Sequence, residues 1–387
     1  ADSVSGLRAG ETLSQVATMV TTRTAYRVLD ARNELVLEIA DDQVESGLPD
    51  GESMLHSWRE VEVELGPAGK QKDLKRARKL LTAAGATPST LRTKLDRALG
   101  PISPGDQGST VQAGKLKPNT LGDLVTAYVA TQCDVLASND IGLRTGAPVV
   151  HKTRVAARRL RSTLRVFDDV FGEQSTEELN NELSWYAELL GQVRDREVLS
   201  ARLTQHIADL PPEQVRGPVE AEITKTLAAE RDDALQRLSR GMRSRRYRHL
   251  LMLLRSWKTA PPLSDAADQK GKTAAQYVKR AKQKANKRLR SADGDFEQLH
   301  RARKATKRLR YAAELVEPVD GNMKGVAKKA ENLQTLLGEH QDAVVSAEFL
   351  SNLSASRNGE SGDGFSYGIL IADELHRAAA IRQSLEK

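Results

Sequence analysis

The sequence has little cysteine, few aromatic residues and no long apolar run. Of its 387 residues one is a cysteine, Cys133, so no disulfide can form within the chain. The first residues lack the basic-then-apolar pattern of a secretory signal. The longest apolar run is the five residues Leu250 to Leu254, whereas a membrane-spanning helix needs roughly 20. These absences argue against a disulfide-rich secreted protein and a helical membrane protein, and they favour a cytoplasmic one.

Positive charge is abundant but unevenly distributed. The chain has 59 Lys and Arg against 52 Asp and Glu, a net charge of +7. Residues 1–70 contain 6 basic and 13 acidic residues, so the rest of the chain has a net charge of +14. A long basic segment indicates a polyanionic partner. Aromatic residues make up only 4% of the chain, so platforms for stacking nucleic-acid bases are scarce and recognition through phosphate groups is favoured.

Strands followed by helices are predicted for residues 1–99. The segments 24–29 and 35–39 are rich in apolar and β-branched residues and flank a short turn, which predicts a hairpin. Residues 73–98 show a helical pattern with a break near the middle. The stretch 100–118 has four glycines, three prolines and no apolar period, and it is interpreted as a linker.

A third strand is predicted over residues 58–65, where polar and apolar residues alternate without interruption. The alternation places three glutamates on one face of the strand and three apolar side chains on the other, which is expected to be the buried face. The glutamates are Glu60, Glu62 and Glu64, and the apolar residues are Val61, Val63 and Leu65.

Everything from residue 119 to residue 387 is predicted to be helical. Asn119, Pro148 and a Ser175–Glu178 capping box are typical of helix starts. The predicted helices cover 119–137, two segments that begin at Pro148 and Ser175, and then 195–209, 213–240, 243–257, 266–292, 295–316, 322–338, 340–355 and 365–386.

The helical part contains an internal repeat. Residues 150–161 align without a gap on residues 299–310, and both copies read His-x-x-Arg-x-x-x-basic-Arg-Leu-Arg. The element 190–195 then recurs as 337–342 at nearly the same spacing. Matching order and spacing indicate duplication of one multi-helix unit, with repeat 1 over about 119–258 and repeat 2 over about 266–387.

The repeated helix has a basic stripe. At 3.6 residues per turn, its histidine and the basic residues that follow fall within about 80° of arc, opposite an apolar stripe. A single charged helix face is usually ordinary solvated surface, but cations of one sign repel one another, and an anionic ligand would relieve this repulsion. Duplication of the stripe favours a binding role, and arginine suits phosphate because its planar fork can donate two hydrogen bonds. The stripes comprise His151, Arg154, Arg158, Arg161 and Arg165, and His300, Arg303, Lys307 and Arg310. Further basic residues flank them, including Arg246, Arg248, Lys279, Lys284 and Arg288.

Through these motifs, residues 119–387 resemble the CHAD domain, a family of helical domains named for its histidines. The resemblance implies a mainly α fold of two pseudo-symmetric four-helix bundles that binds inorganic polyphosphate on its basic surface without a cofactor, with possible targeting to polyphosphate granules. Two differences between the repeats matter for binding: Lys307 aligns with Arg158, and His340-Gln341 aligns with Val193-Arg194. The implied binding residues are His151, Arg154, Arg158, Arg161, Arg165, His300, Arg303, Lys307, Arg308 and Arg310.

The N-terminal segment resembles the C-terminal part of a CYTH domain, the triphosphate tunnel fold. This resemblance rests on Arg23, Arg27, the pair Asp41–Asp42, the strand 58–65 and Lys94. A complete domain of this family would hold Mg²⁺ or Mn²⁺ on inward glutamates, here Glu60, Glu62 and Glu64. About 65 residues of strand pattern cannot close an eight-stranded tunnel, so a partial domain is expected.

Three functions therefore remain open. The first is polyphosphate binding by the duplicated basic stripes. The second is a metal-dependent triphosphatase, which requires the missing half of the barrel. The third is a nucleic-acid binder that contacts the phosphate backbone.

Overall fold

The structure is a computed structural model that describes residues 15–47, 54–89, 93–99, 119–292, 295–356 and 364–386. The predicted linker over 100–118 lies outside the described residues. The chain divides into two compact units. The described residues from 15 to 99 belong to one unit, and those from 119 to 386 belong to the other.

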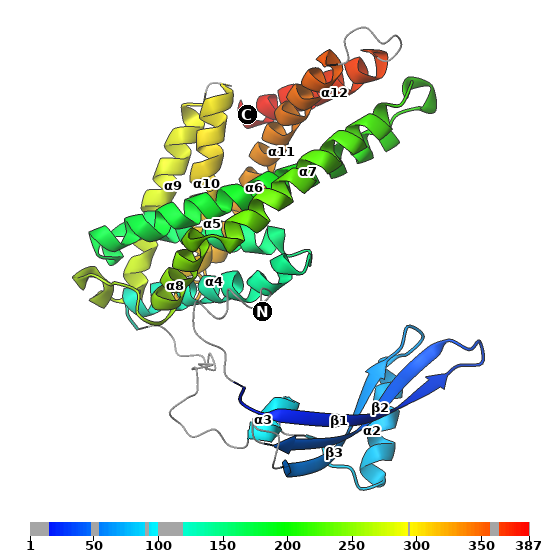
Figure 1. Ribbon diagram of the computed structural model, residues 1–387. Helices are drawn as coiled ribbons and strands as arrows, with labels where there is room; N and C mark the ends of the chain where they lie inside the picture. The colour runs from blue at the N-terminus through cyan, green and yellow to red at the C-terminus, as the bar shows by residue number, and fades with distance from the viewer. Residues whose placement is uncertain are drawn as a thin grey trace. The chain divides into compact units, whose positions relative to one another are not determined.

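In its described residues the smaller unit is a three-stranded antiparallel sheet with two short helices (Figure 1). The predicted hairpin is confirmed and is longer than expected, because its arms pair from Thr18↔Gly47 to Leu29↔Leu35. Its turn is closed by Asp30, whose carboxylate accepts hydrogen bonds from two backbone N–H groups, and by Asn33 at φ 64°. The elements are β1 (Thr18–Leu29), β2 (Leu35–Gly47), β3 (Met54–Leu65), α2 (Gln71–Ala83) and α3 (Lys94–Leu99).

The better buried face of the sheet is the one that carries the glutamates, contrary to the sequence prediction. Val44 and Asp42 of β2 are fully buried and pair with Trp58 and Glu60 of β3. The side chains expected in the core, Val61, Val63 and Leu65, are half-buried or exposed. The reason lies in α3, because Lys94 ion-pairs with Asp42 and Arg97 lies 5.2 Å from the Trp58 ring centroid. The strand pattern alone could not reveal a covering helix.

The larger unit is built almost entirely from α-helices, in agreement with the predicted mainly α fold (Figure 1). Neighbours in sequence pack against each other: α4 on α5, α5 on α6, α6 on α7, and α9 through α12 in turn. The main helices are α4 (Leu121–Arg144), α5 (Val150–Val166), α6 (Glu173–Ala208), α7 (Val219–Arg243), α8 (Arg245–Thr259), α9 (Ala274–Arg290), α10 (Phe296–Val316), α11 (Met323–Ala355) and α12 (Gly364–Glu386).

Two long helices each join segments predicted as separate from the sequence, and α4 extends to Arg144, beyond the predicted end at 137. The separate segments at Ser175 and at 195–209 form one helix, α6, of 36 residues that begins at Glu173. The segments 322–338 and 340–355 form one helix, α11, of 33 residues. Gly191 and Gly338 lie inside these helices, where they mark close contacts with arginine side chains and not helix ends. In the opposite sense, the predicted helix 266–292 starts only at Ala274, after two 3₁₀ turns.

The hydrophobic core joins the two repeats. The largest cluster of buried side chains combines Leu160 and Leu164 of α5 and Leu190 of α6 with Leu309 and Ala313 of α10. A second cluster combines the distal ends of α6 and α7 with α11 and α12. Because α5 packs directly on α10, the two copies of the histidine-containing helix lie side by side.

Candidate functional site

Four cations gather where α5 meets α10. Arg154 and Arg158 come from α5, and Arg303 and Lys307 come from α10. Burial, together with the positive charges of Arg158, Arg303 and Arg154, lowers the pKa of Lys307 to about 6. Burial also lowers the pKa of Arg158, with Arg154 and Arg303 acting in the same direction. We call these four residues the central cluster.

No described residue places a counter-charge in direct contact with Lys307 or Arg158. Lys307 is only 8% exposed, yet among the described residues neither side chain forms an ion pair or a side-chain hydrogen bond. Buried cations are normally paired, because removing a charge from water is costly. The central cluster therefore stores unfavourable energy that a bound anion would release.

Arg154 and Arg303 occupy equivalent places in the two repeats. Arg154 lies over Gly191, where an added Cβ would be 3.5 Å from its Nε, and its Nη2 is 3.1 Å from Asp195. Arg303 lies over Gly338 in the same way, and its Nη2 is 3.9 Å from Asp342. The repeated Leu-Gly pair was visible in the sequence, but its role in making room for a guanidinium was not.

The histidines at the start of each stripe have different surroundings. Burial lowers the pKa of His151, and the nearby Arg194 and Arg154 add to this effect. His300 instead lies 2.8 Å from the amide oxygen of Gln341, the residue that aligns with Arg194. Burial also lowers the pKa of His300. Both rings are expected to be neutral near pH 7, so neither adds charge, and the single N–H of neutral His300 is already donated to Gln341.

A second group of cations continues from the central cluster. Burial lowers the pKa of Arg308, and the charges of Arg165, Arg161 and Arg288 lower it further. None of the four arginines, Arg161, Arg165, Arg288 and Arg308, forms an ion pair with a described residue. The Nε atom of Arg161 is buried without a hydrogen-bond partner among the described residues. We call Arg161, Arg165 and Arg308 the lateral cluster. The structure thus brings together predicted site residues from both repeats.

Comparison with known proteins identifies this helical unit. The family model for the CHAD domain matches residues 127–351, which is more than half of the chain. The chain belongs to the CHAD domain family.

Relatives and solved structures agree with this assignment. The chain is 32% identical over 395 residues to the uncharacterized proteins Rv2226 and MT2285 of two Mycobacterium tuberculosis strains, an alignment that covers 96% of this chain and 74% of each relative. The crystal structure of the CHAD domain from the plant Ricinus communis matches with a TM-score of 0.53 and 25% identity, over 70% of this chain and 93% of that one. PptA from Streptomyces chartreusis matches with a TM-score of 0.57 and 20% identity, over 69% of this chain and 98% of that one.

Other predicted basic residues of the CHAD domain lie outside the two clusters. Arg310 ion-pairs with Glu314 and Glu331 at 2.8 and 2.9 Å, so its charge is already balanced. Arg246 ion-pairs with Glu182 at 2.7 Å and lies over the Trp185 ring. The remaining flanking residues are exposed on α8 and α9, and they are Arg248, Lys279, Lys284 and Arg288.

The N-terminal sheet brings together two of the three predicted metal-binding glutamates. Oxygen atoms of Asp42, Glu60 and Glu62 lie within 4.8 Å of one another, whereas Glu64 is not part of this group. Arg23 donates two hydrogen bonds of 2.7 Å to the buried Asp42 carboxylate, and Lys94 contacts all three carboxylates at 2.5 to 3.4 Å. Because two cations already satisfy the carboxylates, this donor set does not fit a divalent metal ion as it is arranged.

No helix in the described part of the chain is long and apolar enough to cross a membrane.

Proposed function

We propose that this CHAD domain binds inorganic polyphosphate, with the central cluster as the core of the site. CHAD domains are known polyphosphate-binding domains, and the family assignment brings this function into consideration. The observation that carries the proposal is the pair Lys307 and Arg158, two basic side chains close enough for the charge of Arg158 to lower the pKa of Lys307 and without an ion pair to any described residue. A polyphosphate chain supplies closely spaced negative charges, and each arginine can donate two hydrogen bonds to one phosphate group.

The mechanism is electrostatic. A linear polyanion lies along the seam between α5 and α10, contacts the central cluster first and extends toward the lateral cluster. Its charge removes the repulsion among the cations and shifts the pKa of Lys307 upward, so that lysine is protonated in the complex. Arg310 is left out of the proposed site because Glu314 and Glu331 already neutralise it.

Nucleic acid is a weaker candidate because the aromatic residues near the basic helices are not available for base stacking. Tyr247, Tyr277 and Tyr311 are 1%, 5% and 6% exposed, so their rings belong to the core. A protein that binds single strands usually offers exposed aromatic faces as well as cations. Binding through phosphate groups alone would not distinguish RNA from DNA.

The test is competition at about physiological salt, where weak surface electrostatics are screened. Labelled long-chain polyphosphate is bound to the full chain and displaced with unlabelled polyphosphate, single-stranded RNA or duplex DNA. Polyphosphate should compete at least about tenfold better per phosphate than either nucleic acid. Equal displacement by all three would reduce the domain to a general polyanion binder.

A triphosphatase is retained as a second candidate for the N-terminal unit, because Arg23, Lys94 and three carboxylates meet on one face of the sheet. This meeting agrees with the resemblance to a partial CYTH domain. Release of inorganic phosphate from tripolyphosphate by the full chain, dependent on Mg²⁺ or Mn²⁺ and abolished by Glu60→Gln with Glu62→Gln, would support it. The pairing of these groups with one another makes us expect no such release.

A further inference from the structure

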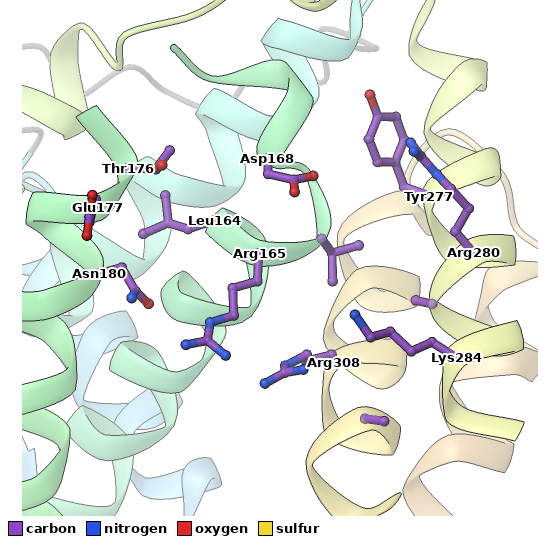
Figure 2. A pocket seen from close by; sticks show the side chains of 13 residues that line it. Leu164, Arg165, Asp168, Thr176, Glu177, Asn180, Tyr277, Arg280, Lys284 and Arg308 are labelled. Atoms are coloured by element: carbon purple, nitrogen blue, oxygen red, sulfur yellow. The ribbon is translucent and has the colours of Figure 1, made fainter. Parts of the chain in front are cut away.

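A cavity of about 500 Å³ lies beside the lateral cluster, between α5, α6, α9 and α10 (Figure 2). Arg165 at the end of α5, Lys284 of α9 and Arg308 of α10 point toward its interior from different sides (Figure 2). Arg280 of α9 and Asn180 of α6 also line the cavity.

The internal repeat shows which residues stand at the place equivalent to this cavity in the other repeat. The two copies of the histidine-containing helix are related by a shift of 149 residues, which makes Arg308 equivalent to Arg159 and Arg165 equivalent to Glu314. Arg159 and Glu314 form an ion pair of 2.8 Å. At the equivalent place on the other side of the seam, Arg308 therefore faces another arginine where the repeat places a carboxylate.

At two neighbouring positions, too, an apolar residue on one side corresponds to a polar or charged residue at the cavity. With the same shift, Lys284 is equivalent to Val135 of α4, which packs against the hydrophobic core. With the shift that relates Asp195 to Asp342, Asn180 is equivalent to Ala327 of α11, which also packs against the core. One side of the seam is thus apolar and closed by an ion pair, and the other is polar, open and rich in cations.

Several polar groups of the cavity lack partners among the residues that the structure describes. Three cations of the cavity form no ion pair with a described residue: Arg165, Arg308 and Lys284. A fourth cation, Arg280, forms an ion pair of 3.3 Å with Asp169. The Oδ1 atom of Asn180 is buried without a hydrogen-bond partner. Buried polar atoms are rarely left unpaired, and such a group indicates a missing partner. The carboxylates of Asp168 and Glu177 also line the cavity, so the cations exceed the acids there.

We propose that this cavity is a separate site for one terminal phosphate group, carried either by the end of a polyphosphate chain or by a small phosphate compound. The proposal rests on the proposed function for its ligand chemistry, but it centres on Arg165, Arg308 and Lys284 and not on the central cluster. Three unpaired cations suit the roughly double negative charge of a terminal phosphate. A terminal phosphate can also carry a proton and donate it to Asn180 Oδ1 or to a wall carboxylate, which the interior phosphates of a chain cannot do.

The symmetry supplies a variant that closes the site without disturbing the fold. Arg165→Glu places a carboxylate opposite Arg308, as Glu314 is placed opposite Arg159, so the unliganded variant should melt at the same temperature as the wild type or higher. Calorimetric titration with tripolyphosphate should show two classes of site in the wild type and one in the variant. The affinity of the lost class should fall at least about tenfold, because charge-assisted hydrogen bonds are removed. Arg245→Glu, a charge reversal at an exposed position of α8, is the matched control and should keep both classes.

The failure of this inference is distinguishable from failure of the proposed function. If Arg165→Glu leaves both classes intact while alanine substitution of the central cluster removes binding, the cavity is not a site and the proposed function stands. If Arg165→Glu removes all binding and the central substitutions remove none, the proposed function falls and the cavity remains. Titration with orthophosphate separates the two sources: saturable binding that Arg165→Glu abolishes supports a small phosphate compound, and binding of tripolyphosphate alone supports a chain end.

Discussion

Arg154 and Asp195 form an ion pair of 3.1 Å across the surface of Gly191. The equivalent pair in the second repeat, Arg303 and Asp342, is looser at 3.9 Å. Each end of the central cluster therefore has a carboxylate that holds an arginine in place and competes with an incoming phosphate. The affinity for a polyanion is a balance between these two effects.

We expect competition to dominate, because both carboxylates are substantially exposed and their ion pairs are correspondingly weak. Asp195→Asn together with Asp342→Asn should raise the affinity for long-chain polyphosphate several-fold, and the effect should shrink as salt is increased. Fluorescence anisotropy at two salt concentrations measures this. A fall in affinity would mean that the carboxylates mainly position the arginines.

Removing the central cluster should severely weaken the binding of long-chain polyphosphate while preserving the fold. The variant replaces four residues together by alanine: Arg154, Arg158, Arg303 and Lys307. Because these basic side chains no longer contact the polyanion, the slope of log affinity against log salt should become shallower. Helix content should be unchanged, because alanine is the best helix former. The matched control removes four exposed cations of α7 and α8, namely Lys225, Arg240, Arg243 and Arg245. Comparable loss in both variants would mean that only the net charge matters.

Lys307 should lower the stability of the free protein. Its pKa is about 6 in the fold against an ordinary value of 10.5, so the folded state disfavours the proton that the unfolded chain binds. The penalty is absent above the ordinary pKa, grows as pH falls and is complete below about pH 6. Lys307→Met should stabilise the protein by about 1–4 kcal/mol near pH 6, the range found when buried ionic groups are replaced by apolar ones, and by less at pH 9.

Denaturant unfolding at pH 6 and pH 9 measures this difference. The exposed Lys304 of the same helix is the control, because Lys304→Met should change stability little at either pH. If Lys307→Met destabilises the protein at pH 6, the lysine has a counter-charge that the structure does not contain. In the wild type, polyphosphate binding near pH 7 should be accompanied by proton uptake, since bound phosphate raises the pKa of Lys307.

Much of the central site could be predicted from the sequence because it repeats. A helical period and a duplicated His-x-x-Arg pattern were sufficient to place Arg154 and Arg303 on corresponding faces. The pattern could not show that α5 packs against α10, so the meeting of the two stripes and the burial of Lys307 required the tertiary structure. It also did not separate Arg310 from the other cations: Glu314 follows Arg310 at i+4, but the second partner, Glu331, comes from another helix. The face of the N-terminal sheet was predicted wrongly for a similar reason, since the covering residues of α3 are distant in sequence.

A buried ionic network should make the distal part of the helical unit sensitive to pH. His206 of α6 lies 3.2 Å from the buried Glu374 of α12, which also accepts hydrogen bonds from Arg202. The hydrogen bond to Glu374 raises the pKa of His206, so this contribution to stability is present below about pH 6.5 and is lost as pH rises through the folded value. Burial raises the pKa of Glu374, but hydrogen bonds from His206 and Arg202 lower it overall, so its contribution is lost only in acid.

His206→Gln should therefore remove stability at pH 6 but little at pH 8. The loss at pH 6 should be about 1–3 kcal/mol, the usual cost of breaking a buried charge-assisted hydrogen bond. Chemical unfolding at the two pH values provides the measurement, and His376→Gln, at an exposed position of α12, is the control. An equal loss at both pH values would show that the ring matters for packing and not for charge.

The N-terminal sheet should depend on Asp42 and not on a divalent metal. Asp42 is fully buried and accepts hydrogen bonds from Arg23 and Lys94, which lower its pKa despite its burial. A depressed folded pKa gives stability that is present above about pH 4 and lost in more acidic solution. Asp42→Asn should lower the melting temperature of the sheet in the full chain, because two cations then lose their shared partner.

Mg²⁺ or Mn²⁺ at millimolar concentration should leave the melting temperature of the wild type unchanged, since Lys94 already occupies the space between the carboxylates. A rise on adding either ion, removed by Glu60→Gln with Glu62→Gln, would mean that the metal displaces Lys94 and would restore the triphosphatase as the leading candidate for this unit.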